Sequence, residues 1–391
     1  MNAVPSAILA RLQDDFDSRE ELLRQIITDR LADKPAPSVP DHGFLAAFDP
    51  VTGTIYAGDL AKPDIDVINA ATCHAGDLAR CAPVAEIPMP DPQANVGAID
   101  DATHTLYASD ESASGSVAVI NTAACNARHT SGCHARPALI TLGGAYPGLP
   151  ELDYATATLY VPYGSNGSQV AVISTAACTA ADTTGCHAPF ATVTVGDGTA
   201  DLAVSQTTDT IYAPGSGASN FDGRTVAVIN GATCNGTDTA GCAQLAATIT
   251  VGGGPFGVAV DDAAHTLYVA NNANGDSPGT VSIINTATCN GTDIAGCHDR
   301  SPVIATGISP LLMALDGQAG ALYVADYGSA QVTIITTTHC NAADTRGCAT
   351  ASREQTVGSD PFGVFIDVGD RTVYVTDLFQ AGSMSVLAAG R

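Results

Sequence analysis

A short apolar run that ends in tyrosine recurs seven times along this chain of 391 residues, and this repeat constrains the fold more than any other feature. Each tyrosine follows Leu, Ile or Val, and successive copies are 51, 53, 52, 56, 55 and 51 residues apart. The copies are Tyr56, Tyr107, Tyr160, Tyr212, Tyr268, Tyr323 and Tyr374. A period near 50 residues with about four short β-type runs per unit is typical of a β-propeller. The sequence therefore predicts an all-β, seven-bladed propeller of four-stranded antiparallel blades.

The fifth repeat shows the expected unit most completely. Its apolar runs cover residues 257–261, 266–270, 280–285 and 302–305, separated by turns rich in Gly, Asn and Asp. Runs of this length between turn formers read as strands. Because strands joined by such short turns must be antiparallel, each repeat forms one meander that buries its faces against its neighbours.

Two phrases of this repeat carry a family resemblance. Gly-Pro-Phe-Gly-Val-Ala-Val-Asp at 254–261 and Thr-Leu-Tyr-Val-Ala-Asn at 266–271 make the chain resemble the YVTN-repeat, YncE-like propellers, over roughly residues 41–390. The resemblance implies a seven-bladed propeller. It leaves the activity open, because that broad group includes binding proteins and related seven-bladed propellers include lactonases and a streptogramin-type lyase.

The two ends of the repeat array predict how the ring closes. The last repeat stops after its third expected strand, residues 385–387, and alignment of the repeats places residues 35–39 on the fourth strand 247–251. We expect residues 35–39 to be the outer strand of blade seven, an edge position where prolines are tolerated. The alternative is an extended linker. The propeller domain would then span residues 35–391.

Residues 1–34 do not fit the repeat and form a separate N-terminal extension. Apolar side chains recur there at roughly helical spacing: Ile8, Leu12, Phe16, Leu22, Leu23, Ile26, Ile27 and Leu31. This pattern predicts an amphipathic helix, or two short ones, whose apolar stripe needs a partner. The partner is either the propeller's own flank or a second protein, through docking or dimerisation.

Charge limits the partners. The formal net charge is −25, and Lys34 and Lys62 are the two lysines of the chain. Such a surface repels nucleic-acid phosphate and anionic lipid, and it attracts metal cations or basic partners. No apolar run approaches 18 residues, so we expect no membrane insertion. The N-terminus also lacks a signal-peptide pattern, which favours the cytoplasm unless a signal has been removed.

Twelve cysteines form six pairs, each with the spacing Cys-x7-Cys between the third and fourth expected strands of a blade. The pairs are Cys73/Cys81, Cys125/Cys133, Cys178/Cys186, Cys234/Cys242, Cys289/Cys297 and Cys340/Cys348. Cysteines at the two ends of a loop between antiparallel strands come close enough for a disulfide. An even count with none left over indicates six local bridges. These imply an oxidising compartment such as a secreted or cell-surface location, in conflict with the missing signal peptide.

Two other interpretations of the cysteines stay open. The pairs could be reduced thiols, or they could bind zinc or copper with a neighbouring histidine. Histidines adjoin several of the cysteines: His74, His134, His187, His298 and His339. One pair with one histidine supplies at most three ligands, and neighbouring residues on a strand point to opposite faces.

Internal comparison of the repeats singles out polar residues on three inner strands. Glu151 and Asp201 stand where other repeats carry small or apolar residues, and Asn95 differs from the Phe or Leu at its position in four other repeats. A carboxylate there faces the channel or is buried at a cost of several kcal/mol. We therefore expect a polar site biased to blades two to four. His42, near the top of blade one, is the histidine best placed for acid–base work. The alternative is a hydrogen-bonded or water-filled channel without a ligand.

A second ring lies three residues after the repeat tyrosines. Its polar members, Asp59, Asp110, Asn271, Asp326 and Asp377, either cap the following loops or form an acidic collar for a divalent cation. Aromatic residues could supply apolar walls for a ligand: Tyr146, Tyr163, Phe221, Tyr327 and Phe379.

Together these features favour a ligand- or protein-binding propeller scaffold that presents its channel face to a small molecule or a protein. The alternative is a hydrolase or lyase of lactonase type that uses channel carboxylates and a divalent cation. Its candidate residues are Glu151, Asp201, Asn95 and His42.

Overall fold

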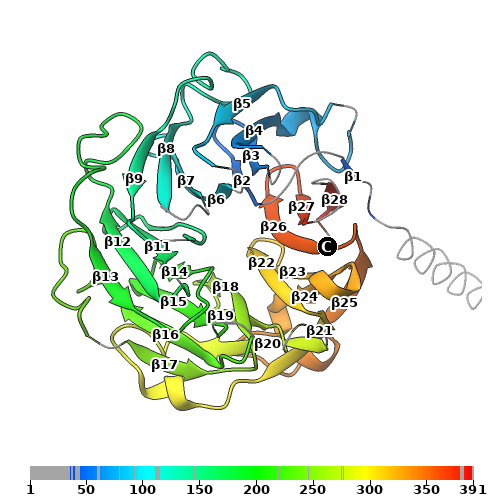
Figure 1. Cartoon of the computed structure of the whole chain (residues 1–391). Helices are drawn as coiled ribbons and strands as arrows, with labels where there is room; N and C mark the ends of the chain where they lie inside the picture. Colours follow the sequence, from blue (N-terminus) through cyan, green and yellow to red (C-terminus); the bar gives the residue numbers. More distant parts are fainter. Residues whose placement is uncertain are drawn as a thin grey trace, which may run out of the picture.

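The computed structural model describes residues 36, 38–39, 45–59, 62–78, 80–91, 94–110, 115–144, 146–164, 166–217, 221–244, 246–273, 275, 277–378 and 383–389. Seven four-stranded antiparallel sheets are arranged as blades around a common centre (Figure 1). The predicted all-β, seven-bladed propeller is thus confirmed. The predicted helix in residues 1–34 lies outside the described residues, as do His42 and Phe379.

The blades follow one another along the chain. Blade one contains β2 (Ala46–Asp49), β3 (Thr54–Gly58), β4 (Asp64–Asn69) and β5 (Ala85–Pro88), and blade two contains β6 (Ala94–Asp100), β7 (Thr105–Asp110), β8 (Ser116–Asn121) and β9 (Ala138–Thr141). Blade three contains β10 (Glu151–Asp153), β11 (Thr158–Tyr163), β12 (Gln169–Ser174) and β13 (Ala191–Thr194), and blade four contains β14 (Ala203–Ser205), β15 (Thr210–Gly215), β16 (Thr225–Asn230) and β17 (Ala247–Thr250). Blade five contains β18 (Pro255–Asp261), β19 (Thr266–Asn271), β20 (Pro278–Asn285) and β21 (Val303–Ile308). Blade six contains β22 (Pro310–Asp316), β23 (Ala321–Asp326), β24 (Gln331–Thr336) and β25 (Ser352–Thr356).

Blade seven combines the two ends of the described chain. Its strands run in the order β1 (Ser38–Val39), β28 (Met384–Ala388), β27 (Thr372–Asp377) and β26 (Pro361–Asp367). Ser38 pairs with Ser385 and Val39 with Met384, so an N-terminal strand supplies the outer edge at the position that the sequence analysis assigned to the closing strand. Figure 1 accordingly shows β1 beside β28, next to blade one.

Short 3-10 helices complete the connections. They are η1 (Ala70–Thr72), η2 (Ala295–His298), η3 (Tyr327–Ser329), η4 (Thr337–His339) and η5 (Cys348–Thr350). Among the described residues, no helix has the length and apolar character needed to cross a membrane.

The repeat tyrosines fasten neighbouring blades to each other. All seven are fully buried, and in six of them the hydroxyl donates to the carbonyl oxygen of the first cysteine of the next blade, at 2.6–3.0 Å. The donor–acceptor pairs are Tyr56–Cys125, Tyr107–Cys178, Tyr160–Cys234, Tyr212–Cys289, Tyr268–Cys340 and Tyr374–Cys73. Each bond satisfies a phenol and a carbonyl that would otherwise be buried without partners. The tyrosine that recurs once per repeat in the sequence therefore makes the recurring hydrogen bond between neighbouring blades.

A second bond accompanies the tyrosine bond at the same six junctions. The threonine two positions before each tyrosine accepts, through Oγ1, the backbone N–H found two residues after the cysteine, at 2.8–3.2 Å. Blade six has Ala321 at this position, and the described part of blade seven contains no cysteine loop. The junction between blades six and seven therefore has neither the threonine acceptor nor the cysteine-loop N–H donor of this bond.

All twelve cysteines are joined within their own loops, which confirms the six predicted bridges. The Cα–Cα distances are 4.6–4.7 Å. The bridges are Cys73–Cys81, Cys125–Cys133, Cys178–Cys186, Cys234–Cys242, Cys289–Cys297 and Cys340–Cys348. Because every cysteine is bonded to its partner, the two other interpretations, reduced thiol pairs and zinc or copper sites, are wrong for this structure.

The turn residues inside the loops favour closure of the bridges. In blade four, for example, Asn235 accepts the N–H groups of Thr237 and Asp238 through its side-chain oxygen. An asparagine that bonds its own following backbone fixes a tight turn. The turn therefore holds the two ends of the loop close together, where Cys234 and Cys242 meet.

Candidate functional site

Apolar side chains from five blades form a cluster at the centre of the ring. Leu45 and Leu312 are buried, and four partly buried residues pack against them: Leu149, Phe256, Phe362 and Leu378. The six residues come from blades one, three, five, six and seven. Blades that are not neighbours can meet only near the axis, so this cluster is an apolar plug across the channel. The rings of Phe221 and Phe362 each lie 6.2 Å from that of Phe256, measured between centroids. The plug was not predicted from the sequence, although apolar residues at the start of five inner strands indicate it.

Asp201 interrupts this apolar layer. It stands eleven residues before its repeat tyrosine, the position occupied by Leu45, Leu149 and Leu312 in blades one, three and six. Only 9% of its surface is exposed, and its Oδ2 accepts the backbone N–H of Val258 from blade five at 2.9 Å. Burial raises its pKa to about 7, against the opposing effect of backbone N–H groups that bond the carboxylate.

Glu151 is the second acid of the channel wall. It begins β10 and stands nine residues before its tyrosine, where five other repeats have alanine and blade seven has Phe365. Although its side chain is partly exposed, the surrounding wall desolvates it and raises its pKa to about 8, with the charge of Asp201 as the second cause. Among the described residues, no Lys, Arg or His forms an ion pair with either acid. Within the described part of the chain, the pair thus has backbone N–H donors at Asp201 but no cationic side chain as partner.

Asn95 and Tyr146 lie near these strands but have different surroundings. Asn95 is buried, and its Nδ2 donates to the carbonyl oxygen of Pro147 in blade three at 2.9 Å, so its amide links two blades. Tyr146 is 60% exposed in the loop before β10, with a positive φ of 57°. A non-glycine residue in this backbone region is uncommon, and such residues concentrate at turns and functional loops.

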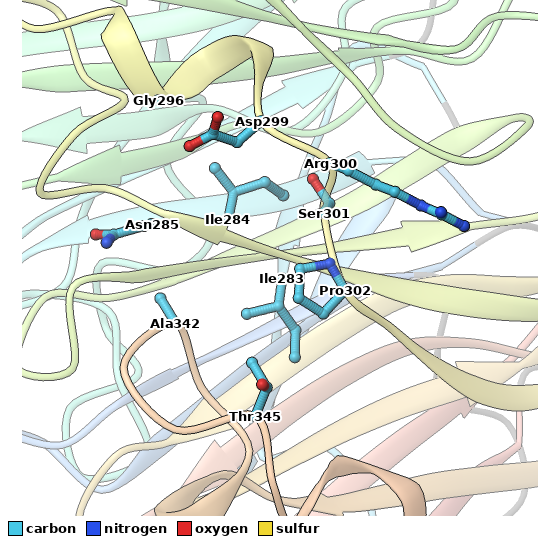
Figure 2. Close-up of a pocket in the computed structure, with 10 residues that line it drawn as sticks. All are labelled: Ile283, Ile284, Asn285, Gly296, Asp299, Arg300, Ser301, Pro302, Ala342 and Thr345. Carbon is cyan, nitrogen blue, oxygen red and sulfur yellow. The ribbon is translucent and has the colours of Figure 1, made fainter.

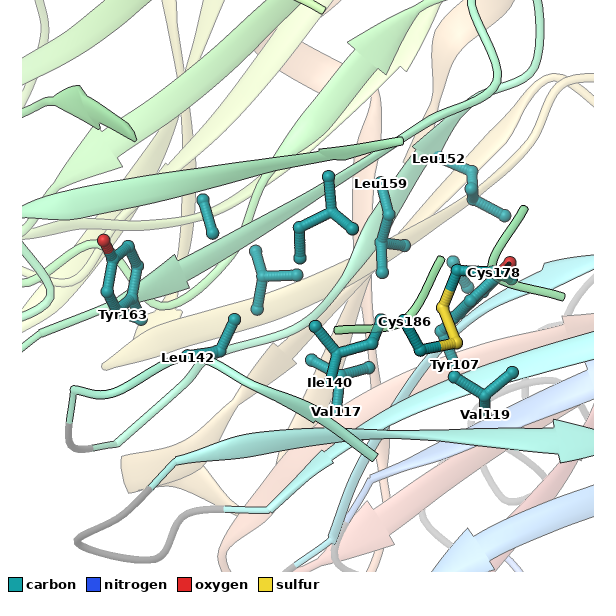
Figure 3. Packing of buried hydrophobic residues seen from close by; sticks show 14 residues of the cluster. Tyr107, Val117, Val119, Ile140, Leu142, Leu152, Leu159, Tyr163, Cys178 and Cys186 are labelled. Carbon is teal, nitrogen blue, oxygen red and sulfur yellow. Dashed lines mark hydrogen bonds between the residues drawn. A yellow bond between two sulfur atoms is a disulfide. The ribbon is translucent and has the colours of Figure 1, made fainter. Parts of the chain in front are cut away.

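The other predicted aromatic residues are not gathered around one site. Figure 3 shows Tyr163 in the apolar core shared by blades two and three. Its hydroxyl lies 2.8 Å from Oγ1 of Thr192, and its ring meets the edge of Phe190 at 6.1 Å. Phe221 packs on the plug, whereas Tyr327 begins η3 and has a pKa raised by burial and by the charge of Asp360. Of the three that the structure describes, Tyr163, Phe221 and Tyr327, the ring contacts join Phe221 to the channel cluster.

The cysteines are not part of the channel site. They pack into the apolar clusters between neighbouring blades, which are separate from the plug. The second cysteines of the first three bridges show this placement: Cys81, Cys133 and Cys186 are each at most 3% exposed and each lie in such a cluster. Figure 3 shows one of these bridges, Cys178–Cys186, against the core shared by blades two and three. The cysteines predicted from the sequence are therefore structural bridges, and none belongs to a ligand site in the channel.

The second ring of polar residues is distributed over five blades, and each member bonds locally. Asp326 accepts from Thr333 at 2.6 Å and Asp377 accepts from Ser383 at 2.6 Å. Burial raises the pKa of Asp326 to about 7 and that of Asp377 to about 6. The remaining local bonds join Asp59 to Lys62, Asp110 to Ser116 and Asn271 to Ser282. In the part of the chain that the structure describes, no three His, Cys, Asp or Glu side chains form a group that could hold a metal ion.

Pockets also occur at the rim, beside the cysteine loops. One of about 230 Å³ lies between the loops of blades five and six, where Asn285, Asp299 and Thr345 line it (Figure 2). An equivalent pocket of about 140 Å³ lies between blades four and five. Small-molecule sites are usually about 300–1,000 Å³. Because the two pockets are small and occupy equivalent places in the repeat, we assign them to blade packing.

No protein-family model matches the chain, and no curated protein matches it either. Two solved structures are similar in fold. Kuenenia stuttgartiensis hydrazine synthase has a TM-score of 0.66 at 15% identity, with 89% of this chain and 96% of that chain covered. The Myceliophteria thermophila Cps50 (Swd1) β-propeller domain has a TM-score of 0.62 at 8% identity, covering 91% of this chain and 100% of that chain. At these identities the likeness concerns the fold alone. The protein is a seven-bladed β-propeller braced by six intra-blade disulfides.

Proposed function

We propose that this protein is a ligand-binding β-propeller, and that its channel site at Glu151 and Asp201 takes a small organic cation. The observation that carries the proposal is the replacement of a plug leucine by Asp201 beside a second acid, with no ion-pair partner among the described residues. Natural proteins retain such locally unfavourable groups mainly at functional sites. The resemblance to YVTN-repeat propellers, a group that includes binding proteins, agrees with this role.

The chemistry of the wall defines the ligand class. An ammonium group placed between the two carboxyl groups would neutralise their charge in a poorly hydrated environment, where ion pairing is strong. The plug residues Phe256 and Leu149 offer apolar contact for the rest of the molecule. Because both acids must be ionised to bind a cation, affinity should rise as the pH increases through about 7 and 8.

The internal repeats supply the variants that test this function. Asp201→Leu and Glu151→Ala restore residues found in other blades, so both should fold. Asp201→Leu removes the acceptor of the Val258 N–H, and it should lower the free energy of unfolding by about 1–3 kcal/mol. Thermal unfolding with increasing n-butylammonium chloride should show a rise in Tm for the parent protein and none for either variant. The control Glu86→Ala removes a carboxylate with 53% side-chain exposure from blade one and should behave as the parent.

Two results would contradict the proposal. One is a parent protein whose Tm does not respond to n-butylammonium or responds as Asp201→Leu does. The other is failure of both variants to fold, which would make the acids structural parts of the ring.

A second candidate function, an acid–base hydrolase or lyase, rests on the same pKa values. A pKa near the working pH is what general acid–base catalysis requires, and the two acids have values of about 8 and 7. A divalent cation needs several oxygen ligands, and the two carboxylates alone do not supply them, so the acids would act here without a metal. Lactone hydrolysis that is abolished by Glu151→Gln and insensitive to EDTA would favour this candidate; absence of turnover would favour binding.

A further inference from the structure

The cysteine loop of blade six differs from the other five in its surroundings. We propose that Cys340–Cys348 is a thiol-exchange site, and that its reduction by a low-molecular-weight thiol releases β25 and loosens the closure of the ring. Three independent features of blade six carry this inference: the exposure of one sulfur-bearing residue, the composition of β25, and the contact of β25 with the N-terminal segment.

Exposure distinguishes this bridge from the others. In the other five disulfides both cysteines are buried, with at most 4% of either residue exposed. Cys340 is buried as well, but Cys348 is only partly buried at the start of η5. A thiolate must reach a sulfur atom to attack it, and exposed disulfides are the labile ones. We therefore expect a small thiol to attack this bridge at Cys348.

The outer strand of blade six also lacks the apolar side chain that anchors the others. Gln355 pairs with Val332, and this position holds a buried Ile or Val in the first five blades. These anchors are Ile87, Ile140, Val193, Ile249 and Ile304, each at most 2% exposed. Gln355 is partly exposed, and Ser352, Arg353 and Glu354 are exposed. Because β25 buries so little apolar surface, its attachment depends more on its backbone bonds and on the disulfide.

The same strand contacts the segment that closes the ring. The N–H of Ala36 donates to the carbonyl oxygen of Thr356, the last residue of β25, at 3.1 Å. Two residues further on, β1 begins its pairing with β28. A change in β25 is thus transmitted directly to the residues that precede the closing strand.

The local charges do not oppose an anionic nucleophile. Arg346 forms a two-point ion pair with Asp344, with both N–O distances at 2.9 Å. The guanidinium of Arg346 holds the pKa of Asp344 well below its usual range and compensates its charge. The loop that carries Cys348 therefore lacks an unpaired carboxylate at this point, in a protein with a formal net charge of −25.

The exchange balances as two thiol–disulfide steps. A thiolate forms a bond to Sγ of Cys348 while the S–S bond breaks, and Cys340 leaves as a thiolate that takes up a proton. A second thiolate then attacks the sulfur of the first reductant in the mixed disulfide, and Cys348 leaves. The bridge gains two electrons and two protons, and two thiols become one external disulfide. The buried Cys340 remains as a free thiol inside blade six.

The test is graded reduction of the folded full-length protein with dithiothreitol, and separately with glutathione, followed by alkylation and peptide mapping. We expect Cys340 and Cys348 to be alkylated at least tenfold faster than Cys289 and Cys297 of blade five. Hydrogen exchange on the partly reduced protein should increase at residues 352–356 and 38–39 before it increases elsewhere. Equal rates for all six bridges, or first reduction of another bridge, would overturn the proposal.

Matched double variants separate the bridge from its consequence. Cys340→Ser with Cys348→Ser should show the faster exchange at residues 38–39, whereas Cys289→Ser with Cys297→Ser should leave that segment as in the parent. If the first variant fails to fold, graded reduction of the parent protein still decides the matter. Fast reduction of Cys340–Cys348 without any change at residues 352–356 would contradict the link to ring closure.

Discussion

The hydroxyl of Tyr374 donates a 2.6 Å hydrogen bond to the carbonyl oxygen of Cys73, which joins blade seven to blade one. These residues lie 301 positions apart in the sequence, yet their contact repeats the geometry found between blades adjacent in the chain. The closing junction therefore uses the same inter-blade chemistry as the internal junctions, and the pairing of β1 with β28 adds to it.

Removing this hydroxyl should weaken the closure. In Tyr374→Phe, the carbonyl of Cys73 stays buried without its donor, which costs about 1–3 kcal/mol for such a group. Chemical denaturation should show a loss of this size in the free energy of unfolding. Tyr146→Phe is the control, since that side chain is 60% exposed, and it should change stability by less than about 0.5 kcal/mol. Equal behaviour of the two variants would mean that the closing bond contributes nothing.

The disulfides should each stabilise their blade. Closing a loop with a sequence separation of 8 should contribute about 2–3 kcal/mol in the chain-entropy model. Replacing Cys234 and Cys242 together by serine should therefore lower the free energy of unfolding by about that amount. Peptide mapping without reductant should recover six intra-loop bridges from the parent protein. Free thiols throughout would contradict this prediction.

The sequence was sufficient to predict the fold, because the information needed is repeated seven times. The tyrosine period defines the blades, and the paired cysteines define the loops, so each prediction rests on several copies. The role of the tyrosine was not predicted. The acceptor of each tyrosine is a backbone carbonyl oxygen; for Tyr56 it belongs to Cys125, 69 residues away. Because every residue has a backbone carbonyl, the residue types do not show which carbonyl accepts the bond.

The candidate site was predicted only in part. Comparison of repeats singled out Glu151 and Asp201. Asp201 is buried, Glu151 is partly exposed, and both have raised pKa values, but their role in binding stays a prediction. It also proposed Tyr163, whose hydroxyl is directed to Thr192 in the blade core. Position in the repeat does not distinguish a side chain that faces the channel from one that faces the core of a blade, because its direction depends on how neighbouring blades pack against it.

The channel acids should make the protein less stable as pH rises. Glu151 has a pKa raised from 4.5 to about 8, and Asp201 has one raised from 3.8 to about 7. Both are neutral in the folded and unfolded chains at low pH. As pH rises, the unfolded chain ionises first, so stability falls until the folded values are passed. The free energy of unfolding should decrease between about pH 4 and pH 8, and less steeply in Glu151→Gln. An identical slope in the variant would contradict this assignment.

Two glycines provide a matched test of blade packing. A Cβ at Gly148 would lie 2.2 Å from the carbonyl oxygen of Ala200, a backbone atom of the next blade, whereas a Cβ at Gly317 would meet nothing within 4 Å. Gly148→Ala should therefore separate blades three and four and lower Tm strongly. Gly317→Ala should be neutral or stabilising by about 0.4–1 kcal/mol, because it restricts the unfolded chain. Similar melting temperatures for both variants would show that the inner strands shift without cost.

Truncation at the N-terminus tests which segment closes the ring. Removing residues 1–34 leaves Ala36 and β1 in place, so the propeller should still fold with β28 paired. Removing residues 1–40 deletes the partners of Met384 and Ser385 and leaves β28 as an unpaired edge, which favours pairing with other chains. We expect a clear drop in Tm and concentration-dependent aggregation for the longer deletion only, measured by thermal unfolding and light scattering. If both deletions melt together, Ser38 and Val39 do not contribute to closure, and blade seven is stable with three strands.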